Sequence, residues 1–279
     1  MKQLITILLT LTIGFSQSLS KEEKQIRSYI DNHNNEAIDL VEKVVNINSG
    51  TLNMEGNKKV GKIFQAELDK LGFHTYWVTY PKEIKRSGHL FAEMRGGKGQ
   101  NILLIGHLDT VFEPDHPFQK YTRKGDTAYG PGVSDMKAGD VSMIYIMKAL
   151  HKIGVLQDMN LTLAFTGDEE KTGGPVSIVR KELVEAGKWA NIGLGFEGAG
   201  GMNTGTIARR SSSSWVLTTT GIQGHSSQIF KDHLGYGAIF EASRILNAFR
   251  EELAPEEYLT FNPGTIVGGT DVNYDPVNS

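Results

Sequence analysis

The sequence predicts an α/β protein in which helices sandwich a mainly parallel mixed sheet, followed by a smaller, partial α+β domain. Three observations lead to this prediction. Between residues 26 and 196, short β-branched and aromatic runs alternate with helical patterns, as strand–helix–strand units do. Residues 102–105 are four consecutive branched aliphatics, the pattern of a strand buried on both faces. Beyond residue 203, apolar and polar residues alternate, as in half-exposed antiparallel strands.

The elements of the larger domain follow from these patterns in order. Apolar residues recur at helical spacing in two early segments, and aromatic or β-branched runs then predict three strands around a turn at 95–100. The predicted helices are 26–49 and 57–73, and the predicted strands are 73–80, 89–94 and 101–106. A helix at 136–153 is apolar over most of its faces, as expected inside a sandwich. The alternation ends with a strand at 160–167, a helix at 176–186 and a strand at 192–196.

The smaller domain is predicted from the change in pattern. Period-two alternation indicates strands at 205–210 and 212–222, a helix follows at 235–253, and 264–269 reads as one more strand. The expected organisation is therefore a domain at 21–204 and an incomplete one at 205–279, with no closing element before the last residue.

Composition excludes several classes of protein. The chain has 279 residues, of which 39% are hydrophobic and 22% charged, which is enough to bury a full core. The formal net charge is −3 and no basic stripe stands out, so nucleic acid is not expected as a partner. There is no cysteine, so a metal site has to use histidine and carboxylates.

The first twenty residues resemble an export signal. Lys2 precedes an apolar stretch at 4–15, and small residues follow at Ser16, Ser18 and Ser20. The stretch is short for a membrane span, so a cleaved signal peptide at 1–20 is preferred to an uncleaved anchor. We expect an exported protein, either periplasmic or secreted.

Acidic and imidazole side chains follow several of the predicted elements. They are His107, Asp109, Asp135, Glu169, Glu170 and Glu197. Because ligands bind beyond the carboxyl ends of the strands in such sheets, these side chains are expected to meet at one edge. Nitrogen and oxygen ligands without thiols suit zinc, and this many carboxylates favour a pair of ions.

Each residue also has a simpler explanation. A lone histidine after a strand is more often a hydrogen-bonding residue than a ligand. Asp135 suits the N-cap of the following helix, and Glu169 with Glu170 suits a solvated turn. The joint occurrence in sheet order favours the metal site. A dinucleotide loop at 130–135 is disfavoured because Asp135 replaces the final glycine, and a serine hydrolase because no G-x-S-x-G occurs.

Five motifs carry a family resemblance: GHLDTV, YGPGVSDMKAG, TGDEE, FEG and GIQGHSS. Together they resemble the signatures of the co-catalytic dizinc exopeptidases that include bacterial glutamate carboxypeptidase, succinyl-diaminopimelate desuccinylase and the aminoacylases. The resemblance implies a zinc-exopeptidase fold with an inserted lid and dimerisation domain. It also implies hydrolysis of a peptide or N-acyl amino acid amide.

The resemblance implies a role for each residue. His107 and Glu197 would hold one zinc, Glu170 the second, and Asp135 would bridge them. The carboxylate of Asp109 would fix the tautomer of His107. Glu169, free of metal, suits a general base that then acts as acid. The lid residue His225 would stabilise the oxyanion, in dimeric relatives from the partner subunit.

The sequence also departs from the family pattern. Relatives complete the second zinc site with a histidine far toward the C-terminus, and no such residue follows here. The expectation is a fragment or a short form, with an inactive metal-binding chain as the alternative to an active hydrolase. An aminoacylase or dipeptidase is an alternative to a carboxypeptidase, because Gly198 and Ala199 follow Glu197 where carboxypeptidases commonly have proline. An incomplete lid argues against a lid-mediated homodimer in this form.

Overall fold

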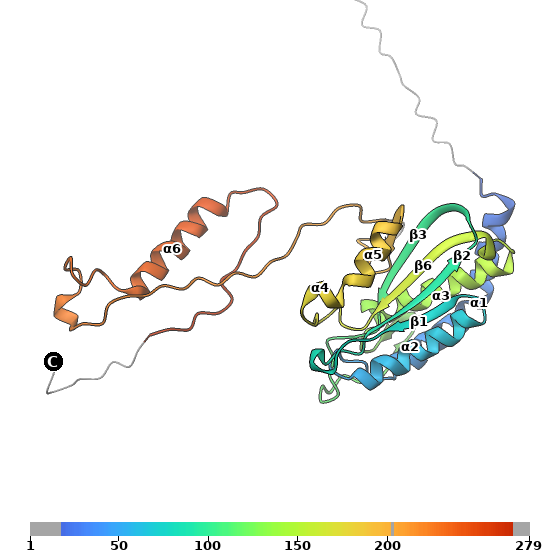
Figure 1. Ribbon diagram of the computed structural model, residues 1–279, viewed down its shortest axis with the longest axis horizontal. Coiled ribbons are helices and arrows are strands. Elements are labelled where there is room, and N and C mark those ends of the chain that lie inside the picture. The colour runs from blue at the N-terminus through green and yellow to red at the C-terminus, as the bar shows by residue number, and fades with distance from the viewer. Residues whose placement is uncertain (1–17, 202–203, 270–279) are drawn as a thin grey trace, which may run out of the picture. The chain divides into compact units, whose positions relative to one another are not determined.

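The computed structural model describes residues 18–201 and 204–269 (Figure 1). Contacts divide the chain into two compact units, Met1–Gly205 and Thr206–Ser279. The predicted signal peptide, apart from residues 18–20, lies outside the described residues. None of the helices described is long and apolar enough to cross a membrane.

The described part of the first unit contains a five-stranded mixed sheet in the order β1-β2-β6-β3-β7. Its strands are β1 (His74–Val78), β2 (His89–Arg95), β3 (Lys98–His107), β6 (Met159–Thr166) and β7 (Ile192–Gly195). β3 is parallel to both β6 and β7, whereas β2 is antiparallel to both β1 and β6. β2 therefore runs against the other four, and the mainly parallel mixed sheet is as predicted. A small hairpin of β4 (Thr122–Lys124) and β5 (Thr127–Tyr129), which the sequence analysis did not predict, lies apart from this sheet.

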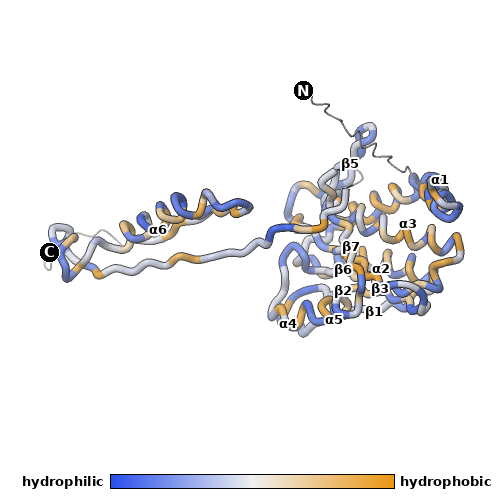
Figure 2. The backbone as a smooth tube through the Cα atoms, turned by 90° about the horizontal axis from the view of Figure 1, so that it is seen from above, coloured by the Kyte–Doolittle hydropathy of each residue, from blue (hydrophilic) through white to orange (hydrophobic). Residues whose placement is uncertain are grey.

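Helices cover both faces of the sheet (Figures 1 and 2). On one face lie α1 (Lys21–Val45), α2 (Met54–Asp69) and α3 (Ala138–Lys152), and on the other lies α5 (Lys181–Trp189). Adjacent residues of one strand enter different cores: Leu104 packs in the larger core and Leu103 in the smaller. β3 is thus buried on both faces, as its run of aliphatics predicts. Three short helical turns complete the unit, at Lys82–Ile84, Val133–Lys137 and Leu156–Asp158.

Two helix predictions need correction. α1 begins at Lys21 rather than at residue 26 because Ser20 is its N-cap. The Ser20 hydroxyl accepts from the Glu23 amide at 3.1 Å and the Glu23 carboxylate accepts from the Ser20 amide at 2.7 Å, a capping box. The helix predicted at 176–186 is two pieces, α4 (Val176–Val179) and α5, broken at Arg180, whose φ is −111° and ψ 4°.

The second unit contains one long helix, α6 (Ala238–Leu253), as predicted, and a short turn at Ser226–Gln228. The strands predicted at 205–210, 212–222 and 264–269 are wrong: the described residues of this unit form no strand. A strand is stable only when a neighbour accepts its backbone hydrogen bonds and covers its apolar side chains. Here Val216 and Val267 are each 90% exposed.

Candidate metal centre

The candidate residues of the first unit gather at the carboxyl ends of three parallel strands. His107 is the last residue of β3, Glu169 and Glu170 follow β6, and Glu197 follows β7. The strand register pairs His107 with Thr166, so β3 and β6 end side by side. This is the sheet edge at which α/β proteins bind ligands.

His107 lies at the centre of the group and is almost wholly buried. Its Nδ1 is 3.0 Å from the backbone carbonyl oxygen of Asp109, so Nδ1 carries the proton and donates it there. The other nitrogen, Nε2, is 2.9 Å from Asp135 Oδ1 and 3.3 Å from Glu197 Oε1. Nε2 thus faces two carboxylate oxygens, an arrangement that suits either a protonated imidazole or a bound cation.

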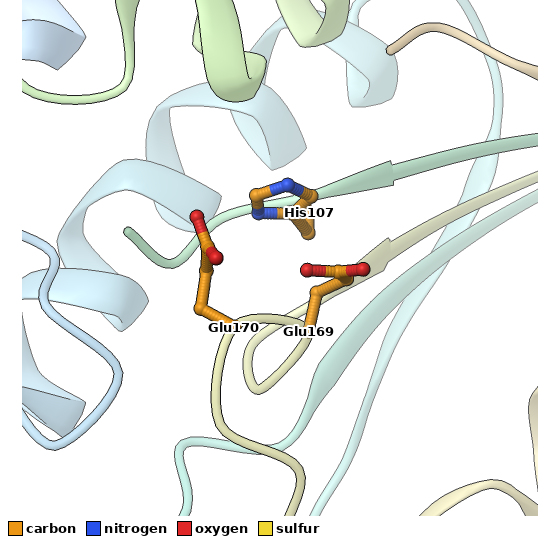
Figure 3. A group of neighbouring side chains, drawn as sticks. All are labelled: His107, Glu169 and Glu170. Carbon is orange, nitrogen blue, oxygen red and sulfur yellow. The ribbon is translucent and has the colours of Figure 1, made fainter. Parts of the chain in front are cut away.

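Two sets of potential ligands share this histidine. One is His107 with Asp135 and Glu197, and the other is His107 with Glu169 and Glu170 (Figure 3). Within each set the donor atoms all lie within 4.8 Å of one another. One imidazole nitrogen with two carboxylate oxygens suits zinc or a similar divalent ion. The geometry therefore brings together all the residues proposed as ligands from the sequence.

The electrostatics of the site also favour a cation. Burial and the negative charge of Asp135 raise the pKa of Glu170 to about 7. Burial alone would lower the pKa of His107, but the hydrogen bond and charge of Asp109 outweigh it and raise that pKa to about 10. Both groups therefore lie among crowded carboxylates, whose mutual repulsion a bound divalent ion would reduce.

Asp109 has a role that the sequence did not reveal. Its Oδ1 accepts from the Glu169 amide at 3.0 Å and its Oδ2 from the Glu170 amide at 3.1 Å. Thr51 Oγ1 also donates to Oδ2, at 2.7 Å. Oδ1 is 3.5 Å from His107 Nδ1, farther than the backbone carbonyl, so the carbonyl orients the imidazole more directly. The carboxylate mainly fixes the backbone that carries the two glutamates.

A buried lysine positions Asp135. The Nζ of Lys137 donates to the carbonyls of Val44 and Ile47, at 3.0 Å each, at the end of α1. Gly132 begins the turn with a φ of 75°, in the left-handed region that favours glycine. The N-cap of α3 is Lys137 and makes no side-chain cap, so Asp135 does not cap that helix and the simpler explanation for it is wrong.

The residues predicted from the sequence did not include one further carboxyl group beneath the site, that of Asp140. Asp140 in α3 is fully buried, and neither carboxylate oxygen has a hydrogen-bond partner among the described residues. Burial holds its pKa well above the ordinary range, although the charges of His107 and Lys137 oppose that rise. The signal was present in the sequence, as an acidic residue within an apolar helical pattern.

His225 belongs to the second unit, apart from the residues above. It is the N-cap of the short turn, where its Nδ1 accepts from the Ser227 amide at 3.2 Å. Its role as an oxyanion donor stays a prediction.

The family of the chain follows from comparison with known proteins. Residues 103–275, which include every candidate residue, match the model of peptidase family M20/M25/M40. The chain belongs to this family. Carboxypeptidase G2 of Pseudomonas sp. (strain RS-16), a similar protein, is 32% identical over 217 residues, covering 75% of this chain and 49% of that protein. Succinyl-diaminopimelate desuccinylase of Gluconobacter oxydans (strain 621H) is 29% identical over 201 residues, covering 68% and 49%.

Solved structures show the same fold. Human carnosine dipeptidase 1 superposes with a TM-score of 0.52 at 19% identity, covering 71% of this chain and 43% of that one. The α/β fold predicted from the sequence is confirmed, as is the resemblance to the M20/M25/M40 peptidases. The chain spans about half the length of the curated relatives it matches.

Proposed function

We propose that this chain carries the zinc site of an exopeptidase or amidohydrolase of the carboxypeptidase G type. The substrate would be a small peptide or an N-acyl amino acid, cleaved at its amide bond. One observation carries the proposal: two sets of potential ligands share His107 at the carboxyl ends of parallel strands, in a chain of the M20/M25/M40 family.

The residues present fit two divalent ions. His107 and Glu197 would hold one ion, Glu170 the other, and Asp135 lies beside both the imidazole and Glu170. Bound ions of this kind lower the pKa of water toward neutrality and polarise a carbonyl oxygen.

Glu169 is placed to move the proton. Its backbone amide is held by Asp109, and its carboxylate lies within 4.8 Å of the donor atoms of His107 and Glu170. In this position Glu169 takes a proton from the attacking water and delivers it to the leaving nitrogen.

Metal titration with an activity assay tests the proposal. In the complete protein, titration with zinc followed by calorimetry should give about two ions per chain. Assays with N-acyl amino acids and dipeptides should then show hydrolysis that a chelator abolishes. A single weakly bound ion without turnover would instead support the inactive metal-binding alternative.

The second unit contributes His225 in this proposal. Replacing it by alanine should lower the turnover number by about 10²–10³-fold, as expected for loss of an oxyanion donor. His233, also exposed in the same unit, provides the matched control, and H233A should leave turnover unchanged. Equal turnover in H225A and H233A would contradict this role.

We also propose that the protein is exported and that it does not form a homodimer. Intact mass of the protein from separated cell fractions should show loss of the segment ending near Ser18 or Ser20. Sedimentation should give a monomer, because the described residues of the second unit form no strand that could pair across a lid interface. A cytoplasmic, full-length product or a stable dimer would contradict these points.

A further inference from the structure

The loop between β6 and α4 presents both Glu169 and Glu170 to the candidate metal site. On the side that faces the site, the two backbone amides donate to Asp109. Two hydrogen bonds on one side do not fix the direction of a loop, because the loop can still pivot about them. Contacts on the opposite side of the loop are therefore needed to hold the two carboxylates in place.

Asp168, directly before Glu169, provides those contacts. Its side chain is fully buried and belongs to neither set of candidate ligands. Its Oδ1 accepts from Arg180 Nη1 at 2.5 Å and its Oδ2 from the Gly173 amide at 2.8 Å. Nη2 of Arg180 donates to the backbone carbonyl of Asp168 at 3.0 Å and to Thr172 Oγ1 at 3.1 Å. One guanidinium thus binds both the side chain and the backbone of the loop.

The start of the loop is tied to the same place by His89. The Gly167 amide donates to His89 Nδ1 at 3.1 Å, so the proton of that imidazole is on Nε2. Nε2 in turn donates to the carbonyl of Val179 at 2.9 Å, the residue before Arg180. Burial lowers the pKa of His89, which agrees with this neutral form. The break between α4 and α5 is therefore where the loop is anchored.

We propose that Arg180 and Asp168 form a positioning clamp that directs Glu169 and Glu170 into the candidate metal site. The clamp rests on the proposed function only in taking the bound ion to be zinc. Neither clamp residue belongs to the potential ligand sets. A buried ion pair is weak evidence for stability, since apolar residues often replace one without loss. The three hydrogen bonds of the Arg180 guanidinium to Asp168 and Thr172 instead suit geometric control, because the planar guanidinium fork fixes the orientation of its partners.

The test compares two arginines of the first unit that both bind a backbone carbonyl, Arg180 and Arg95. In R180Q, amide hydrogen exchange at Glu169 and Glu170 should rise on the order of tenfold or more, because the loop opens locally. Zinc affinity should fall on the order of 10- to 100-fold, as for loss of other groups that support ligands. Arg95 is the matched control: it donates to the Leu161 carbonyl at 2.6 Å, pairs with Glu93 and packs over Trp189, at the opposite end of β6. R95Q should change neither readout, although it lowers the melting temperature.

A lysine variant separates positioning from plain stability. R180K keeps the charge beside Asp168 but cannot make all the contacts of the fork, so it should recover the melting temperature while the two amides stay exposed. If protection returns together with the melting temperature, or if R180Q and R95Q affect the two amides equally, the clamp is wrong. Should R180Q fail to fold, D168N, which keeps the size of the side chain and one of its two acceptor oxygens, replaces it in the same comparison.

The experiment on the clamp can succeed or fail independently of the proposed function. If the unsubstituted chain binds no zinc, the proposed function fails, and amide exchange still decides for or against the clamp because it needs no metal.

Discussion

Both units of the chain contain an amphipathic helix of similar pattern, but only the helix of the first unit buries its apolar face. In the first unit, α2 buries Phe64 and Leu68 completely against the sheet and α3. In the second, α6 has the same length of 16 residues and a comparable apolar stripe, yet none of its residues is buried, and Phe240 is 57% exposed. The contrast teaches that a helical pattern defines an apolar face, whereas burial needs another surface to cover that face.

The chemistry differs between the units in the same way. The potential metal ligands found among the described residues all lie in the first unit, held by buried strands and by Asp109. Carboxylates of the second unit, such as Glu241, pair with exposed neighbours on their own helix. Four experiments test this contrast.

The largest expected effect is on catalysis. Replacing Glu169 by glutamine removes the group that moves the proton and should lower kcat about 10²–10⁴-fold while zinc stays bound. The matched change in the second unit, E241Q, should leave kcat unchanged. Steady-state kinetics and metal analysis measure both, and full activity in E169Q with zinc bound would contradict the base assignment.

The next contrast concerns stability. Phe64 is fully buried, and its ring centroid lies 5.4 Å from that of Phe165, so F64A should cost about 3–5 kcal/mol of unfolding free energy. The same change at exposed Phe240 should cost less than about 0.5 kcal/mol. Urea unfolding of the two variants measures the difference. A large cost for F240A would mean that α6 is covered by another surface in solution.

The stabilisation of the first unit by zinc should depend on pH. Zinc at 100 times its Kd should stabilise that unit by about 2.7 kcal/mol. Binding requires Glu170 and His107 without their acidic protons, and their pKa values are raised to about 7 and about 10. At a fixed zinc concentration the stabilisation should therefore grow as the pH rises through about 7 and on toward about 10.

Without metal the trend should reverse. A raised folded-state pKa favours the protonated form, so the stability from Glu170 is present below its ordinary value of 4.5 and is lost as the pH rises through about 7. That from His107 is fully present below about 6.5 and is lost progressively as the pH rises from there to about 10. Thermal unfolding with and without zinc across this range measures both trends, and parallel curves would contradict the metal site.

The smallest expected effect comes from Asp140. Leucine has the same number of side-chain heavy atoms and removes a buried carboxyl group without hydrogen-bond partners. D140L should therefore stabilise the metal-free protein by about 1–3 kcal/mol at neutral pH, because the cost of the unpaired group disappears. Since the pKa of Asp140 is raised, the gain should shrink at acid pH, where the carboxyl group is protonated in both states. A lower melting temperature in D140L would mean that the carboxyl group has a partner in solution.

The sequence by itself determined the buried strand at Ile102–Ile105, the helices beside it and the candidate ligands, because side-chain period and strand ends are local properties. Only the tertiary structure decided that β2 is antiparallel to its neighbours and that Arg180 breaks a helix and binds Asp168. It also decided that the described alternating segments of the second unit form no strands. Those outcomes depend on which backbone groups and surfaces find a partner far along the chain. No local pattern carries that information.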